Sequence, residues 1–219
     1  MPAPADPPHA TGLTGGTSDY PSSLVGGVRL RDGSHLEVRP IRDTDGPGMT
    51  SFHESLSPRS VYRRFFFAHP RLSPGEVERF THVDYHDRMA FVVTDEERIV
   101  GVGRYERTEA SDEAEVAFVV TDAYQRRGIG ASLLDRLAEV AADHGITTFV
   151  AQTLSENRDM LGVFLNSGFP VDSSSESGTV TVRFPIEPTA DYVRAREARA
   201  ARAAGGSSGA GPQDDPVGR

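Results

Sequence analysis

A strand that leads through a basic, glycine-containing turn into a long amphipathic helix most constrains the fold of this chain. The strand is predicted over residues 113–120 and the turn over 125–130. The helix is predicted from apolar residues at helical spacing, with Gly145 at its end; they are Ile129, Leu133, Leu134, Leu137, Val140 and Ala141. Such a turn directs free helix N–H groups toward one point, where a phosphate or pyrophosphate can bind. An ordinary strand-to-helix turn with a solvated arginine pair is the alternative.

The other segments predict a sheet accompanied by helices. Asp32-Gly33 is a strong hairpin turn, Ser57-Pro58 begins a helix, and Ser73 with Glu76 has the spacing of a capping box. Strands are expected over 28–30, 36–38, 88–94, 98–108, 113–120, 147–154, 169–172 and 179–185, and helices over 43–56, from 57, from 73, over 129–145 and over 156–167. The three strands between 88 and 120 should form an antiparallel meander. This order indicates an α+β (mixed α/β) fold.

Composition along the chain predicts one domain between two tails. Residues 24–187 form a domain of ordinary size. Residues 1–23 have few large apolar side chains to offset the entropy of ordering, so a disordered tail is expected. In residues 188–219 only Tyr192 and Val193 could anchor a helix, which predicts a marginal helix followed by a disordered tail.

Two missing residue types exclude whole classes of chemistry. The 219 residues include no cysteine, which excludes disulfides, thiolate nucleophiles and thiolate zinc sites. They include no lysine, so all 23 basic residues are arginine, and a Schiff base or a Walker loop is excluded. The net charge of −9 argues against nonspecific nucleic-acid binding. Without an apolar run of about 18 residues or a secretory signal, we expect a soluble cytoplasmic protein with no membrane partner.

The turn also differs from the dinucleotide-binding fingerprint. That motif needs a third glycine, where Leu133 stands. It also needs an acidic residue about twenty positions further on, where Val150, Ala151 and Gln152 stand. Neither of the two common nucleotide-binding loops therefore fits this chain.

Two motifs together resemble the GNAT N-acetyltransferase superfamily. Residues 125–130 match its Gln/Arg-x-x-Gly-x-Gly/Ala signature, and residues 157–169 are similar to the end of its motif B. Segments 39–45, 55–66 and 83–86 are similar to the bacterial Pat-like protein lysine acetyltransferases. The resemblance covers about residues 36–185. It implies a mostly antiparallel twisted sheet, splayed at the acyl-CoA site and flanked by helices.

The resemblance implies acetyl-CoA as the acyl donor. The pantetheine arm would pair like an extra strand with Phe118, Val119 and Val120, and Asn157 would bind it. A helix cap is an alternative role for Asn157. The backbone positions assigned to the pyrophosphate are Gln125, Arg126, Arg127, Gly128, Ile129, Gly130 and Ala131.

Transfer to an amine requires a base, because the ammonium group must lose a proton before it attacks the thioester. Glu115 stands where Pat-like enzymes carry an acidic base, and Glu113 on the same strand face is the second candidate. A solvated carboxylate is the alternative for Glu115. Without cysteine as acyl carrier, direct transfer in a ternary complex is expected.

The proton donor to the departing thiolate has no clear candidate. Many family members place a tyrosine near the sulfur, but Phe164 occupies the matching position. The thiolate could be protonated by water or need no proton, because a thiol has a modest pKa. Tyr124 and Tyr85 also remain candidates.

Two further clusters of side chains in the sequence are interpreted as structural. His82, Asp84, His86 and Asp87 are the only residues that resemble a metal-ligand set, and we expect no metal there. The run from Arg63 to Phe67 is interpreted mainly as core packing with a solvated arginine pair, part of which lines the acceptor entrance.

The leading functional hypothesis is a protein Nε-lysine acetyltransferase that acts on metabolic enzymes such as acyl-CoA synthetases. The alternatives are a GNAT acetyltransferase of a small-molecule amine and a non-catalytic acyl-CoA-binding sensor. The oligomeric state is not predicted.

Overall fold

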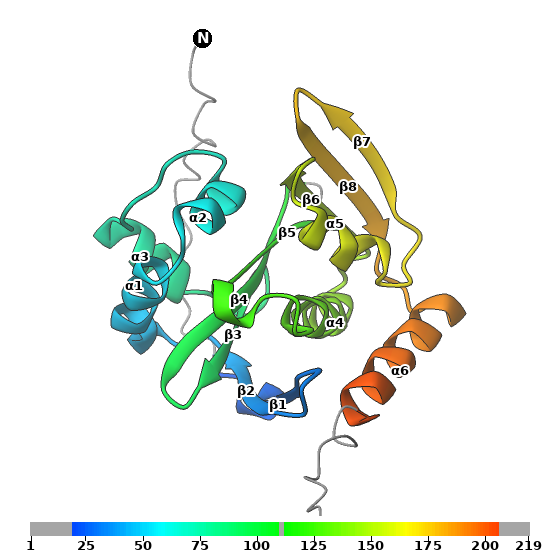
Figure 1. The fold of residues 1–219 in the computed structure, drawn as a ribbon, viewed down its shortest axis with the longest axis horizontal. Helices are drawn as coiled ribbons and strands as arrows, with labels where there is room; N and C mark the ends of the chain where they lie inside the picture. Colours follow the sequence, from blue (N-terminus) through cyan, green and yellow to red (C-terminus); the bar gives the residue numbers. More distant parts are fainter. Residues whose placement is uncertain (1–18, 110–111, 206–219) are drawn as a thin grey trace, which may run out of the picture.

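An eight-stranded sheet in the order β1-β2-β3-β4-β5-β6-β8-β7 runs through the computed structural model, which describes residues 19–109 and 112–205 (Figure 1). Its strands are β1 (Gly26–Arg29), β2 (His35–Pro40), β3 (Arg88–Asp95), β4 (Arg98–Arg107), β5 (Glu113–Val120), β6 (Thr148–Leu154), β7 (Asp172–Glu176) and β8 (Thr179–Pro185). The helices are α1 (Gly46–Glu54), α2 (Pro58–Phe65), α3 (Pro74–Thr81), α4 (Ile129–Asp143), α5 (Arg158–Leu165) and α6 (Ala190–Gly205), with short 3-10 turns at η1 (Ser22–Leu24), η2 (Asp43–Asp45) and η3 (Asp122–Tyr124).

The predicted meander and mixed α/β fold are confirmed. Strands β3, β4 and β5 pair antiparallel in chain order. Strand β6 then pairs parallel to β5, but only from Glu113↔Thr148 to Glu115↔Val150. Beyond Glu115 the two strands diverge, which is the predicted splay in the sheet.

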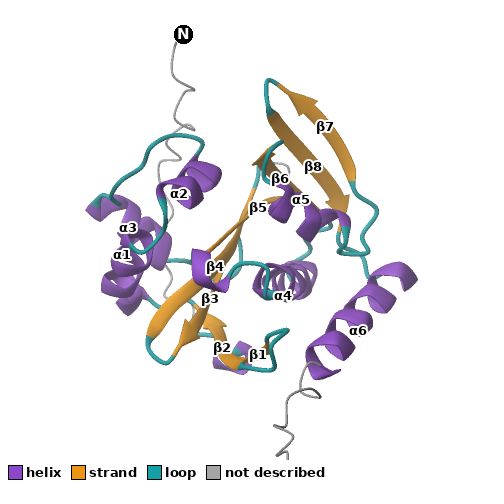
Figure 2. Cartoon of the chain, viewed as in Figure 1, coloured by secondary structure: helices purple, strands orange, loops and turns teal. Residues whose placement is uncertain are grey.

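The sheet has two apolar faces, each covered by its own helices (Figure 2). Val116 and Phe118 of β5 belong to the larger core, together with the apolar face of α4. Ala90, Val92 and Val102 belong to a smaller core with α1 and α2. Because side chains alternate along a strand, Glu115 lies on the same face as Val119, which packs against the smaller core.

Several boundaries differ from the predicted ones. The helix expected over 43–56 is divided into η2 and α1, and α5 is shorter than 156–167. Strand β7 covers 172–176 instead of 169–172, because Phe169 is a buried loop residue that stacks on Phe184 and Tyr192. The capping box of Ser73 and Glu76 forms as predicted.

The segment after residue 187 contributes a packed helix. Tyr192 of α6 is 3% exposed, whereas Val193, the other expected anchor, is 44% exposed. We therefore propose that the domain predicted over 24–187 extends through α6. Most of the predicted N-terminal tail (1–18) and the end of the C-terminal tail (206–219) lie outside the described residues. Within the described ranges, no helix is both long and apolar enough to cross a bilayer.

Candidate active site

The splay between β5 and β6 opens into a cavity of about 610 Å³. Strand β5, the turn before α4, helix α5 and helix α2 all contribute to its wall. Eleven of the predicted site residues line this cavity: Glu115, Phe118, Val119, Val120, Gln125, Arg126, Gly128, Ile129, Gly130, Ala131 and Asn157. Arg127 and Glu113 are not part of its lining.

The start of α4 presents free N–H groups to this cavity. The first hydrogen bond of the helix runs from Ser132 N–H to Gly128 O over 3.1 Å, so the N–H groups of residues 129–131 precede the intrahelical ladder. Gly128 has a φ of 103°, in the left-handed region that favours glycine. This turn therefore combines unpaired N–H donors with the positive end of a 15-residue helix, which is the geometry of an anion site.

Gln125 is a structural strut as well as a lining residue. Its side-chain amide donates to Val120 O and to Ser60 Oγ, each over 3.0 Å. These bonds hold the end of β5 and helix α2 on either side of the turn. The Gln125 side chain therefore positions the turn, while only its backbone is available for the predicted phosphate contact.

Asp122 joins helix α2 to the same turn. It accepts hydrogen bonds from Ser57 N–H (3.1 Å), Ser57 Oγ (2.8 Å) and Ser60 Oγ (3.0 Å). Burial raises the pKa of the Asp122 carboxyl, but these hydrogen bonds outweigh it and leave the pKa below its ordinary value. This contact is not visible in the sequence, because nothing in the residues at the start of α2 indicates a partner 65 positions away.

The two arginines of the signature have different positions. Arg126 is exposed at the cavity. Arg127 donates to Asp32 in the β1–β2 turn and, over 3.2 Å, to Ser34 Oγ, and its guanidinium lies over the Tyr124 ring. The Arg127 side chain is thus engaged with the hairpin, so only its backbone belongs to the turn beside the cavity.

Glu115 is an exposed carboxylate on the cavity wall, at the last paired position of β5 and β6. The residue opposite it on β4 is Glu106, whose charge is compensated by Arg79 at 2.9 Å and by Arg88 at 3.9 Å. No cation of the described residues lies within 4.0 Å of Glu115. Its carboxylate is therefore not neutralised by an ion pair with a described residue.

Arg64 of α2 lines the same cavity, and its positive charge is attracted to the carboxylate of Glu115. Burial lowers the pKa of the Arg64 guanidinium, and the attraction of Glu115 partly opposes this shift. The second candidate base, Glu113, instead forms an ion pair with Arg183 of β8. Of the two glutamates, only Glu115 meets the cavity.

Asn157 caps a helix and also lines the cavity. Its Oδ1 accepts a hydrogen bond from Met160 N–H over 3.3 Å, so it caps α5. The residue is also 7% exposed and lines the cavity. Because the cap uses the oxygen, the amide NH₂ is the group left for a ligand.

Neither of the two tyrosines considered as proton donors to the thiolate places a free hydroxyl in the cavity, and the position usual for a tyrosine holds Phe164. Phe164 lines it and packs between Phe118 and Phe184, with ring centroids 6.0 and 5.8 Å away. Tyr124 lines it too, but its hydroxyl donates to Asp95. Tyr85 lies outside the lining, and its hydroxyl donates to Ile41 O over 2.8 Å.

The segment with spaced His and Asp residues forms an ordinary loop. Asp84 Oδ1 accepts the backbone N–H groups of His86, Asp87 and Arg88, at 2.8 to 2.9 Å. In the described residues, no group of three or more His, Asp or Glu side chains is arranged to hold a metal ion.

Comparisons with known proteins agree with this fold. The chain matches the Acetyltransferase (GNAT) family over residues 56–169, slightly more than half of its length. It therefore belongs to the GNAT acetyltransferase family, and by that membership it is an N-acetyltransferase.

Individual relatives point to one branch of the family. The GNAT domain of S. lividans PAT is 40% identical, with 76% of this chain and 99% of that chain covered and a TM-score of 0.72. Acetyltransferase Pat of Mycolicibacterium smegmatis is 31% identical over 136 residues, which are 61% of this chain and 40% of that protein. The predicted resemblance to Pat-like enzymes is thereby confirmed. YncA of Salmonella typhimurium, solved with its cofactor acetyl-CoA, is 16% identical with a TM-score of 0.56 over 71% of this chain and 96% of that chain, and shows the fold alone.

Proposed function

We propose that this chain transfers an acetyl group from acetyl-CoA to the Nε amine of a protein lysine in the cytoplasm, with Glu115 as general base. One observation carries the proposal: Glu115 and the free N–H groups at the start of α4 line the same cavity. A carboxylate base and an anion site within one cavity suit a donor with a diphosphate in its middle and a reactive thioester at its end.

The open edge of β5 suits the pantetheine arm. Because β6 leaves β5 after Glu115, the backbone of Phe118, Val119 and Val120 has no partner strand on that side. Pantetheine amides would supply hydrogen bonds there, as an added strand would. The NH₂ of Asn157 would donate to the same arm from α5.

Transfer then proceeds directly within a ternary complex. Glu115 accepts a proton from the lysine ammonium, and the neutral amine attacks the thioester carbonyl carbon. A C–N bond forms, the C–S bond breaks, CoA leaves as its thiolate, and the second proton of the attacking nitrogen passes to water in the open cavity. Phe164 has no hydroxyl that could donate a proton. The CoA thiolate is therefore protonated by water in the open cavity, or the thiolate departs unprotonated.

The kind of acceptor is proposed from the relatives. The PAT and Pat relatives support a protein lysine, and acyl-CoA synthetase-like enzymes are the acceptors implied by the resemblance to that branch. The experiment is to incubate the purified chain with labelled acetyl-CoA and a lysate, and then with a purified acyl-CoA synthetase. Label in discrete protein bands is expected. Label only in small molecules would contradict a protein acceptor, and binding without transfer would indicate a sensor.

A further inference from the structure

Four arginines at the cavity lack a carboxylate partner. Arg31 of the β1–β2 turn, Arg126, Arg158 at the start of α5 and Arg202 of α6 all line it and are exposed. In the described part of the chain, none of the four has a carboxylate oxygen within 4.0 Å. This is a local excess of positive charge in a chain whose net charge is −9.

Helix α6 is held against the domain by close packing. Tyr192 stacks on Phe169 with ring centroids 4.2 Å apart. Gly168 has a φ of 93°, and a Cβ at this position would lie 2.6 Å from Tyr192 Cα. The chain can approach the helix this closely only because residue 168 is glycine.

Arg199 fixes the second half of α6. Its Nη1 donates to Asn166 O and Ser167 O, each over 3.1 Å, and its Nη2 donates to Asp135 Oδ1 of α4 over 2.7 Å. The helix is thereby tied both to the end of α5 and to α4. Arg202 lies nearly one turn further along and is the last cation of the described helix.

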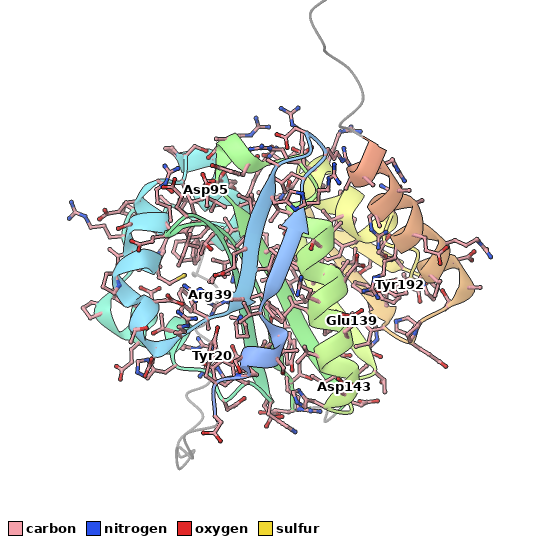
Figure 3. All side chains as sticks on the ribbon, turned by 90° about the horizontal axis from the view of Figure 1, so that it is seen from below. Tyr20, Arg39, Asp95, Glu139, Asp143 and Tyr192 are labelled. Atoms are coloured by element: carbon pink, nitrogen blue, oxygen red, sulfur yellow. The ribbon has the colours of Figure 1, made fainter. Side chains whose placement is uncertain are left out.

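These contacts bring the end of α6 to the part of the cavity where α4 begins. In Figure 3 the red end of α6 lies on the side of the molecule opposite Asp143, the last residue of α4, and hence on the side where α4 begins. The cavity lining agrees, because it includes both Gly128 and Arg202. The β1–β2 turn is tied to the same place, since Arg31 N–H donates to Arg127 O over 3.2 Å.

We propose that α6 is part of the donor site and that Arg202, together with Arg31 of the same cavity lining, binds the 3′-phosphate of CoA. This inference rests on the proposed function. With the thioester near Glu115 and the diphosphate at the start of α4, the nucleotide must extend outward, past the turn and toward Arg202. A phosphate monoester carries close to two negative charges, and guanidinium groups bind such an anion through paired N–H donors. Helix α6 lies outside residues 56–169, which the family match covers.

The test compares equilibrium binding of CoA and of 3′-dephospho-CoA to three full-length proteins: the wild type, Arg202→Gln and Arg194→Gln. Arg194 is the matched control, because it is on the same helix, pairs with Asp191 and is not part of the cavity lining. We expect Arg202→Gln to weaken CoA binding by roughly three- to tenfold and to leave dephospho-CoA binding unchanged. Arg194→Gln should bind both ligands as the wild type does.

Each other outcome counts against a defined claim. Equal weakening of both ligands, or no change with CoA, would overturn the role of Arg202 while leaving the proposed function intact. Wild-type protein that binds neither ligand would overturn both proposals. The thermal midpoint of each variant establishes that it is folded, and both positions are exposed.

Discussion

The side chain of Gln125 donates a hydrogen bond to Ser60 Oγ over 3.0 Å and so links the turn before α4 to helix α2, and both residues line the cavity. A second bond from the same amide reaches Val120 O. One side chain thus sets the positions of the end of β5, the turn and α2. Through this geometry the first residue of the signature shapes the proposed donor site.

Replacement of Gln125 by Ala should loosen the site without unfolding the protein. Two hydrogen bonds are lost, and Ser60 keeps its bond to Asp122. We expect a loss of about 1 kcal/mol in the free energy of unfolding and a higher KM for acetyl-CoA. Urea denaturation and steady-state kinetics measure the two effects. An unchanged KM would show that the hydrogen bonds of the Gln125 side chain do not position the turn.

Replacement of Gly128 by Ala should damage the donor site more strongly. The φ of 103° is strained for any residue with a Cβ, although open space surrounds the position. We expect a destabilisation of about 1–3 kcal/mol, or a turn that relaxes and binds CoA weakly. Calorimetric titration with CoA and thermal unfolding distinguish these outcomes. Gly75→Ala, at another open position, is the control. Normal stability together with normal CoA binding would contradict the account.

The stability of the fold should fall on mild acidification because of His144. Burial lowers the pKa of His144, and His86, whose ring centroid is 4.5 Å away, lowers it further with Arg107, whereas Asp143 and Asp87 oppose the shift. The unfolded chain therefore binds the proton first as the pH falls below about 6.5. The contribution of His144 to the free energy of unfolding is therefore constant above that pH and decreases as the pH falls below it.

Denaturation curves between pH 7.5 and pH 5 measure this effect. His144→Asn should have a shallower loss of stability over that range than the wild type. His35→Asn, at an exposed position on β2, should keep the wild-type slope. The same slope in all three proteins would contradict the assignment to His144.

The sequence predicts the local elements well, because each depends on neighbours along the chain. The period of α4, the caps at Ser57 and Ser73, and the antiparallel meander all appear as expected. The family signatures also lead to the residues that line the cavity. These signals concern residues that are close in sequence or share a recognised motif.

The contacts that assemble the site could not be predicted in this way. Arg127 pairs with Asp32, which is 95 positions away in the sequence, and Glu113 pairs with Arg183, which is 70 positions away. Each pairing depends on which surfaces meet after folding, and charged residues in the sequence do not indicate their partners. The docking of α6 is a further example, because it depends on the absence of a side chain at Gly168.

Glu115→Gln, with Glu113→Gln as its matched control, gives the most direct test of the account. Glutamine keeps the size of the side chain but cannot accept the proton, so Glu115→Gln should bind acetyl-CoA normally while its kcat falls by at least about 100-fold. Glu113→Gln breaks the ion pair with Arg183, which lies outside the cavity lining, and should keep most of the activity. The measurement is kcat for both variants, with acetyl-CoA binding determined on the same samples. Full turnover by Glu115→Gln, or loss of turnover in Glu113→Gln alone, would contradict the role of Glu115 as the base.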